Sequence, residues 1–147
     1  MAGLFVRTAE PRDLQRVYAI EVAAFTNPYS PLYLRLLLEL AGDLFLVAEE
    51  DGEITGYVIA LPRRHGVCHI VSIAVDPQWR RRGVGKVLLH SIMYLCEEKG
   101  LKAFMLEVEH TNHAAQALYL SSGFKPVAMV PNYYGAGRHA VVMAALG

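Results

Sequence analysis

The stretch WRRRGVGKVLL, residues 79–89, places three arginines and two glycines directly before an apolar pattern with helical spacing. The first N–H groups of a helix have no intrahelical acceptor and carry a partial positive charge. Glycines before a helix let an anion approach the backbone closely, and arginines add charge and donors suited to phosphate. The stretch therefore predicts a phosphate cradle at the start of a helix.

The spacing of this stretch does not match two well-defined phosphate-binding loops. A P-loop requires an earlier glycine and a Ser or Thr after its lysine, whereas Val87 follows Lys86 here. A dinucleotide fingerprint requires a third glycine where Leu88 stands. The alternative interpretation is a solvated basic turn in which the glycines serve only a tight loop. These residues alone leave both interpretations open.

The composition narrows the class of protein. The chain has 147 residues, so we expect one domain over 1–147 with a full hydrophobic core. Lys plus Arg and Asp plus Glu both number 14, and zero net charge argues against a nucleic-acid binder. The N-terminus shows no signal-peptide pattern, and the most apolar stretch, 33–48, carries Arg35, Glu39 and Asp43. We expect a cytoplasmic protein with no nucleic-acid or membrane partner.

The two cysteines, Cys68 and Cys96, match no metal-binding or redox spacing. We expect them to be reduced, mostly buried thiols, as is usual in a cytosolic protein. A pair formed by His69 and one glutamate would supply only two metal ligands, too few for a dedicated site. The sequence therefore predicts no metal centre.

Hydrophobic periodicity and turn residues predict alternating helices and strands along the whole chain. The predicted strands cover residues 3–9, 43–50, 53–62, 67–75, 102–109, 124–130 and 139–146. The predicted helices cover residues 11–22, 33–40, 83–99 and 112–122. The strand at 67–75 is long and rich in β-branched residues, so we expect it to be buried on both faces. The order predicts a mixed sheet with helices packed on it, in the α/β or α+β class.

Further motifs accompany the arginine-glycine loop, which reads R-x-x-G-x-G at Arg80, Gly83 and Gly85. It follows a strand ending in SIAVDP and precedes LEVE, then N-x-x-A-x-x-L-Y, then GF. This arrangement resembles the GNAT acetyltransferase superfamily, and more narrowly its protein N-terminal (Nα) acetyltransferases of the RimI and archaeal Ard type. The resemblance covers nearly the whole chain. It implies the GNAT fold, with a mixed, mostly antiparallel seven-stranded sheet and about four helices packed on both faces.

The resemblance also implies acetyl-CoA as cofactor, held in three ways. The arginine-glycine loop would wrap the pyrophosphate with backbone amides, and the strand before it would pair its backbone with the pantetheine arm. A backbone N–H of that strand would polarise the thioester carbonyl. Asn112 would bind the cofactor, cap the following helix, or do both. The implied cofactor-binding residues are Ile73, Ala74, Val75, Arg80, Arg81, Arg82, Gly83, Val84, Gly85, Lys86, Asn112 and Tyr119.

Glu107 and Tyr119 are the implied acid–base pair for attack of an amine on a thioester. The amine must be neutral to attack, so a base is useful, and the departing thiolate benefits from an acid. The resemblance assigns Glu107 as base and Tyr119 as acid. Independently, strand alternation puts Glu107 beside Met105 on one face, where partial burial favours a base. The alternatives are a solvated or salt-bridged Glu107 and a Tyr119 that is only a core aromatic.

His69 occupies the place where archaeal relatives carry a histidine assigned to amine deprotonation or substrate contact. We expect His69 and Glu107 on adjacent strands, facing one cleft. The alternative is a core histidine hydrogen-bonded to backbone. Whether Glu107 or His69 is the main base stays open.

The substrate side is implied by two loops. PNYYG resembles the NYY motif that holds an incoming peptide N-terminus, which indicates Asn132, Tyr133 and Tyr134. The loop FTNPYSP corresponds to the other wall of the cleft, with Phe25 and Tyr29 as candidates. Together with His69, these are the predicted substrate-binding residues. Relatives usually carry acidic residues after NYY where this chain has Arg138 and His139, so the preferred N-terminal sequences stay open.

The leading hypothesis is an enzyme that acetylates protein or peptide N-termini by direct transfer in a ternary complex. Ribosomal proteins or nascent chains are the expected substrates, and a monomer is the expected state. One alternative is acetylation of lysine side chains or small amines, because the fold does not fix the acceptor. Two others are a non-catalytic acyl-CoA sensor and an RNA-contacting module. The three candidate catalytic residues argue against the sensor, and zero net charge argues against the RNA-contacting module.

Overall fold

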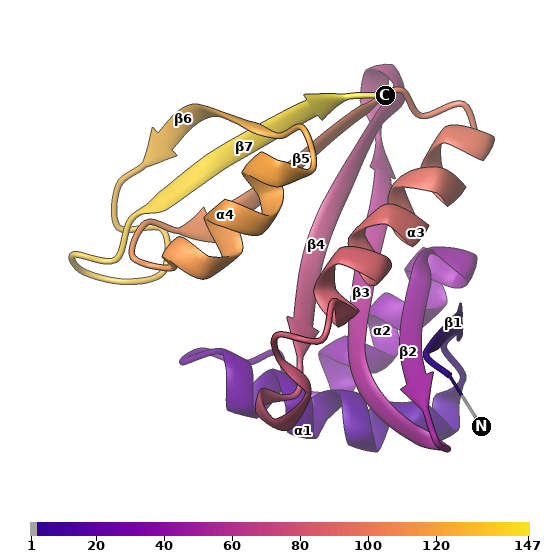
Figure 1. The fold of residues 1–147 in the computed structure, drawn as a ribbon. Coiled ribbons are helices and arrows are strands. Elements are labelled where there is room, and N and C mark those ends of the chain that lie inside the picture. The colour runs from indigo at the N-terminus through magenta and orange to yellow at the C-terminus, as the bar shows by residue number, and fades with distance from the viewer. Residues whose placement is uncertain (1–2) are drawn as a thin grey trace.

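A computed structural model describes residues 3–147, which form one seven-stranded sheet in the order β1-β2-β3-β4-β5-β7-β6 (Figure 1). Only the β4–β5 pairing is parallel. The strands are β1 Phe5–Thr8, β2 Phe45–Glu50, β3 Glu53–Arg63, β4 Val67–Val75, β5 Ala103–Glu109, β6 Lys125–Val130 and β7 Ala140–Leu146. The helices are α1 Leu14–Ala24, α2 Pro31–Ala41, α3 Val84–Glu98 and α4 His113–Ser121. This confirms the predicted order and class, with ends displaced by three residues at most.

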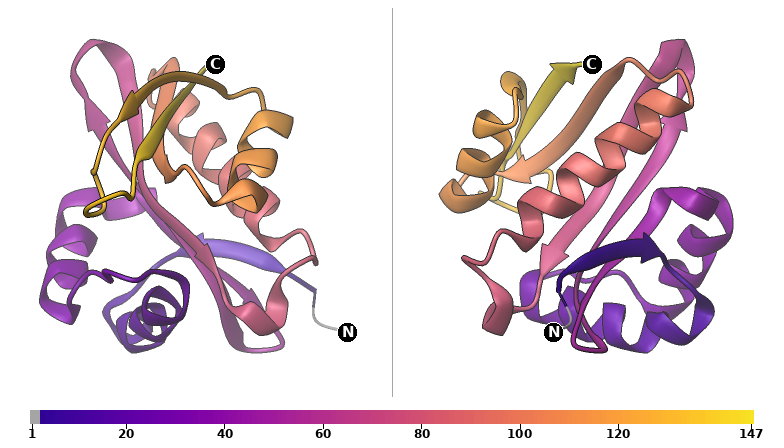
Figure 2. Two further views of the ribbon diagram at one scale, coloured as in Figure 1. Left: turned by 90° about the vertical axis from the view of Figure 1, so that its left-hand side faces the viewer. Right: turned by 45° about the vertical axis from the view of Figure 1, so that its right-hand side comes forward.

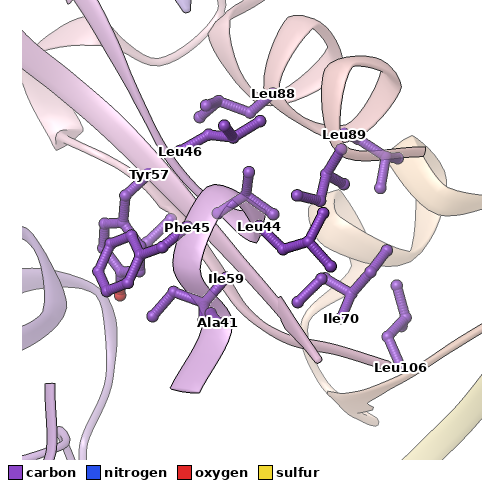
Figure 3. Packing of buried hydrophobic residues seen from close by; sticks show 14 of the residues in the cluster. Ala41, Leu44, Phe45, Leu46, Tyr57, Ile59, Ile70, Leu88, Leu89 and Leu106 are labelled. Carbon is purple, nitrogen blue, oxygen red and sulfur yellow. The ribbon is translucent and has the colours of Figure 1, made fainter. Parts of the chain in front are cut away.

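Helices cover both faces of the sheet. The two views in Figure 2 place α3 on one side of the central strands and the α1–α2 pair on the other. Side chains from α3, β2, β3, β4 and β5 meet in one buried cluster, in which Leu88, Leu89, Ile59 and Leu106 are almost inaccessible (Figure 3). Within residues 3–147, no helix combines the length and the apolar character needed to cross a bilayer.

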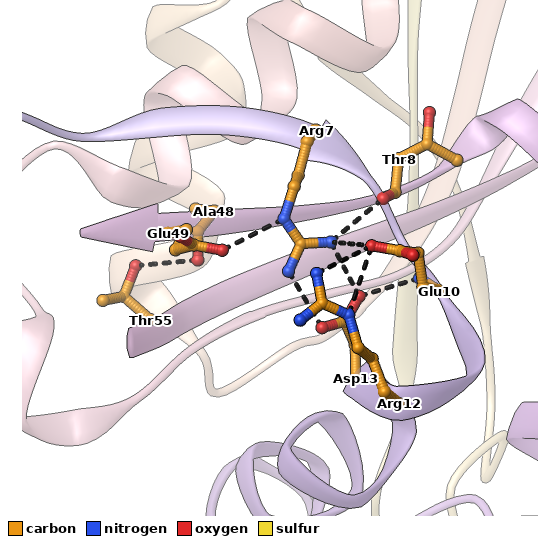
Figure 4. Close-up of polar contacts among 8 residues, drawn as sticks. All are labelled: Arg7, Thr8, Glu10, Arg12, Asp13, Ala48, Glu49 and Thr55. Atoms are coloured by element: carbon orange, nitrogen blue, oxygen red, sulfur yellow. Dashed lines mark hydrogen bonds and ion pairs between the residues drawn. The ribbon is translucent and has the colours of Figure 1, made fainter. Parts of the chain in front are cut away.

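Arg7 anchors the start of α1 to the edge of the sheet (Figure 4). Its guanidinium donates to both carboxylate oxygens of Asp13, at 2.8 and 2.9 Å, and to Glu49 at 3.0 Å. Burial alone would raise the pKa of Asp13, but hydrogen bonds from Arg7 and from the Glu10 N–H hold that pKa below its ordinary value. The ion pair therefore fixes the direction in which α1 leaves the first strand.

A bulge in β4 changes the face that this strand presents. The register with β3 shifts between Ile59 and Ala60, so Val71 has no counterpart. Cys68 contacts α3 while Ser72 contacts α1, although residues four apart in a regular strand share a face. The prediction that β4 is buried on both faces is confirmed only in part. Helices cover both faces of the strand, but buried residues alternate with half-buried ones, and residues 70–73 border a cavity.

The prediction of two reduced cysteines is also wrong. Cys68 and Cys96 are joined by a disulfide that links β4 to α3, and their Cα atoms lie 6.4 Å apart. Both side chains are fully buried, which confirms that part of the prediction. The two cysteines meet because α3 crosses the sheet over β4. The position of a helix on a sheet cannot be read from the spacing of two cysteines in the sequence.

Gly56 of β3 sets how closely the N-terminal half of α3 approaches the sheet. A Cβ at this position would lie 2.9 Å from the carbonyl oxygen of Ala74, 3.0 Å from Leu88 and 3.3 Å from Val84. A backbone oxygen cannot yield as a flexible side chain can. Any larger residue must therefore shift the backbone of β4 at Ala74 and push Leu88 and Val84 of α3 away from the sheet.

We expect Gly56→Ala to lower the free energy of unfolding by about 1–3 kcal/mol through overpacking. Gly3→Ala is the matched control, since a Cβ there meets no atom within 4 Å, and it should change stability by less than about 0.5 kcal/mol. Urea unfolding followed by circular dichroism measures both. Equal stabilities for the two variants would contradict the close approach.

Candidate active site

The central feature of the site is the separation of β4 from β5. These parallel strands pair only over Val67–His69 and Ala103–Met105, and then diverge (Figure 1). A cavity of about 440 Å³ opens where they part, lined by Ile70–Ile73 of β4 and Leu106–Glu109 of β5. Beyond the three pairs, the facing edges of the two strands do not hydrogen-bond to each other. Such backbone groups seek partners, and an extended ligand can supply them.

Three further segments complete the cavity. The end of α1 and the following loop contribute one wall, α4 contributes another, and the loop between β6 and β7 contributes the third. The residues are Glu21, Ala24, Phe25, Thr26, Asn27 and Tyr29 on the first wall, Asn112, Ala115 and Tyr119 on the second, and Tyr133, Tyr134 and Arg138 on the third. Most of the predicted catalytic and substrate-binding side chains are thus brought to one cavity.

His69 and Glu107 form the predicted pair on adjacent strands. His69 Nε2 lies 2.9 Å from Glu107 Oε1, and the Glu107 side chain is 15% exposed. Arg63 approaches the other ring nitrogen, with its Nε and a terminal nitrogen 3.3 and 3.0 Å from His69 Nδ1. A guanidinium can only donate, so Nδ1 must be the acceptor and Nε2 must carry the proton. His69 therefore donates to Glu107, and this arrangement requires a neutral ring.

Tyrosines surround the carboxylate of Glu107. Burial, with smaller contributions from Tyr33, Glu21, Tyr133 and Glu107, raises the pKa of Tyr29 to about 12. The pKa values of Tyr133 and Tyr134 are likewise raised, first by burial and then by neighbouring groups that include Glu107. The phenols stay neutral at any working pH. They can therefore donate hydrogen bonds to a carbonyl oxygen in the cavity.

Tyr119 reaches the cavity from α4. It is almost fully buried, its ring centroid lies 6.0 Å from that of Phe124, and burial raises its pKa well above the ordinary value. A neutral phenol of this kind holds a proton that it can give to a stronger base. Asn112 caps the same helix by accepting the Ala115 N–H at 3.1 Å, which confirms the predicted cap.

The arginine-glycine loop lies at the end of β4, beyond the cavity. Arg81 and Gly83 both adopt positive φ, at 65° and 80°, and α3 begins directly afterwards. The three arginines are exposed, and within residues 3–147 none of them forms an ion pair. Arg82 instead stacks over Trp79 at 4.9 Å. The loop thus keeps free cationic groups beside a helix N-terminus, as a polyphosphate requires.

Some predicted residues lie apart from the cavity. Ala74, Val75 and residues 80–86 do not line it, and Lys86 borders a separate open groove of about 680 Å³ between β1 and α3. Asn132 is also outside, because its carboxamide oxygen accepts the Gly137 N–H at 2.8 Å within the loop. His69 reaches the cavity only through Glu107.

Sequence reasoning missed Glu21 and Arg63. Glu21 has a readable signal, since it follows Val17 and Ile20 on the apolar face of α1 where a charge is unexpected. Arg63 has none, because nothing local distinguishes it from its neighbour Arg64. Glu109, two residues after Glu107 on the same strand, accepts two hydrogen bonds from Arg138, at 2.8 and 3.0 Å, and these lower its pKa.

Comparisons with known proteins agree with this geometry. The model of the acetyltransferase (GNAT) family matches residues 14–124. A Bacillus subtilis protein provisionally named an alanine N-acetyltransferase of ribosomal protein bS18 is 35% identical over 143 residues, 94% of this chain and 92% of its own. An N-alpha-acetyltransferase of Sulfurisphaera tokodaii is 34% identical over 152 residues, 95% of this chain and 91% of its own. The crystal structure of Ard1 from Thermoplasma volcanium matches with a TM-score of 0.94 and 29% identity, covering 97% of each chain.

We expect long-range ¹H–¹⁵N spectra to show the Nε2–H tautomer for His69, because Arg63 occupies Nδ1. Arg63→Met should weaken that preference by removing the donor. Arg64→Met is the matched control, since the hydrogen bonds to His69 come from Arg63 and Glu107. An Nδ1–H ring in the unmodified protein would contradict the assigned geometry.

Proposed function

Because the chain belongs to the GNAT acetyltransferase family, we propose that its cavity carries acetyl transfer from acetyl-CoA to the α-amine of protein N-termini. The observation that carries the proposal is the placement of Glu107, which lies at the parting of β4 and β5 and is ringed by Tyr29, Tyr133 and Tyr134. A carboxylate in a half-enclosed cavity can accept a proton from an amine. The neighbouring phenols can hold the peptide carbonyls that accompany an N-terminal amine.

Acetyl-CoA supplies the acetyl group as an activated thioester. The residues present fit it, because exposed arginines and the free N–H groups of α3 stand at one end of β4 and unpaired backbone stands along its edge. We assign Arg80–Lys86 to the pyrophosphate and Ile73–Val75 to the pantetheine arm. Asn112, at the start of α4, can contact the same ligand while it caps the helix.

Glu107 is the proposed general base. His69 uses its Nε2 proton to hold one carboxylate oxygen of Glu107, and Arg63 fixes the ring in that tautomer. The imidazole is thereby occupied at both nitrogens, whereas a carboxylate keeps further lone pairs for the proton of the amine. We assign His69 to orienting the base and Tyr119 to donating a proton to the departing sulfur. With these roles, we propose direct transfer of the acetyl group in a ternary complex.

The proposed acceptor is the N-terminus of a ribosomal protein or a nascent chain in the cytoplasm. The relatives described above are named for the alanine of a ribosomal protein and for N-alpha acetylation. The tyrosines of two opposing loops give the cavity the width and the donors for an extended peptide rather than for a lone amine. We propose that a single chain is sufficient for the reaction.

The decisive test incubates the purified protein with acetyl-CoA and peptides beginning with Ser, Ala, Met and Met-Leu. An N-terminally blocked peptide that contains lysine is the control. We expect tandem mass spectrometry to place the acetyl group on the free α-amine alone, because the cavity is built for a chain terminus. Acetylation of the blocked peptide's lysine would instead show a side-chain acetyltransferase.

We expect Glu107→Gln to lower kcat by about 10²-fold or more, because the amide cannot take the proton of the amine. Tyr119→Phe should lower kcat less, without abolishing the binding of acetyl-CoA. Glu39→Gln on the exposed side of α2 is the control and should match the unmodified enzyme. Steady-state kinetics and calorimetry measure these quantities, and full turnover by Glu107→Gln would remove it from the mechanism.

A further inference from the structure

Glu21 is a buried carboxylate that the proposed chemistry does not use. It lies near the end of α1, is 2% exposed, and forms no ion pair within residues 3–147. A buried charge without a cation is costly unless hydrogen bonds satisfy it. Three donors do so here, namely the hydroxyl of Tyr57, the hydroxyl of Ser72 at 3.4 Å and the backbone N–H of Tyr29 at 2.9 Å.

Glu21 holds both ends of the loop that follows α1. Its backbone carbonyl accepts the N–H of Phe25 at 3.0 Å, and its side-chain Oε2 accepts the N–H of Tyr29. Both ends of the loop from 25 to 29 are therefore hydrogen-bonded to Glu21. Glu21 is in turn hydrogen-bonded to Tyr57 of β3 and to Ser72 of β4. These bonds fix the position of the loop relative to the sheet.

The clamped loop forms the wall of the cavity that faces the acceptor. Phe25 and Tyr29 line the cavity, and the side chain of Asn27 donates to the carbonyl oxygen of Tyr134 at 3.1 Å. This last bond joins the loop to the opposite wall. The distance between the two walls is thus set by Glu21 on one side and by Tyr134 on the other.

We propose that Glu21 is a positioning residue for the acceptor peptide, holding the loop from 25 to 29 at the width that an incoming N-terminus requires. This inference rests on the proposed function for the identity of the acceptor, but the clamp itself does not. Glu21 acts through Tyr29 and Phe25, and none of its hydrogen-bond partners belongs to the arginine-glycine loop. Its loss should therefore weaken acceptor binding and leave acetyl-CoA binding intact.

The chemistry around Glu21 makes the test selective. The hydroxyls of Tyr57 and Ser72 lie 3.3 Å apart and can bond to each other when the carboxylate is removed. The Tyr29 N–H has no other acceptor of this kind. Truncating the Glu21 side chain should therefore affect mainly the position of the loop. The amide oxygen of a glutamine can still accept that N–H, because the two side chains have the same shape.

The kinetic experiment compares three variants with the unmodified enzyme. We expect Glu21→Ala to raise the KM for the acceptor peptide by about tenfold, the equivalent of one hydrogen bond, with the KM for acetyl-CoA unchanged. Glu21→Gln should restore most of the peptide KM. Tyr57→Phe removes one anchor of Glu21 but keeps the bond to Tyr29, so it should raise the peptide KM less than Glu21→Ala does and leave the KM for acetyl-CoA unchanged.

Amide hydrogen exchange tests the clamp independently of turnover. The Tyr29 N–H should be protected in the unmodified protein and lose protection in Glu21→Ala, while the amides of β3 stay protected. Fast exchange at Tyr29 in the unmodified protein overturns the proposal, even where Glu21→Ala does not fold. An equal rise in both KM values, or no rescue by glutamine, overturns it as well. Acetylation of lysine instead of N-termini refutes the proposed function alone, and the clamp is then judged on the exchange data.

Discussion

The separation of β4 from β5 is the constraint on which the rest of the site depends. Three paired residues at one end hold the strands together, and beyond them the two edges face an open wedge. Backbone groups along such edges cost free energy unless a ligand or water satisfies them. The bulge at Val71 bends β4 at the point where the wedge begins, so the opening is part of the strand's own geometry. An extended ligand can therefore bind without rearranging the core.

The close packing of α3 places the phosphate-binding end of the cavity. Gly56 lets Val84 and Leu88 at the beginning of α3 pack directly against β3, and the disulfide between Cys68 and Cys96 joins the other half of the helix to β4. With α3 held at both ends, its N-terminal amides have a fixed relation to the edge of β4. The cradle and the wedge consequently act as one binding surface for a long cofactor with a charged end and an extended arm.

The sequence predicts the elements better than it predicts the contacts between them. Strand alternation and the cap at Asn112 are local signals, and each element appears close to its predicted range. The resemblance identifies Glu107, and alternation over a single strand adds which face of the sheet it occupies. The bulge, the disulfide and the bond from Arg63 to His69 depend on register between strands or on helix placement, which no local pattern contains. Glu21 lies between these cases, since its position on an apolar helix face is visible but its partners are not.

The charges of the cavity are matched to an acceptor that arrives as a cation and must leave its proton behind. Three carboxylates line the cavity, Glu21, Glu107 and Glu109. Glu109 is paired with Arg138 and Glu21 is bound by three donors, so neither is free to take a proton from a ligand. Glu107 differs from the other two carboxylates, because His69 occupies only one of its oxygens. The other oxygen keeps lone pairs that can accept a proton from a ligand in the cavity. An ammonium group is therefore drawn toward the one carboxylate that can deprotonate it, and the same interaction serves both recognition and activation of the amine.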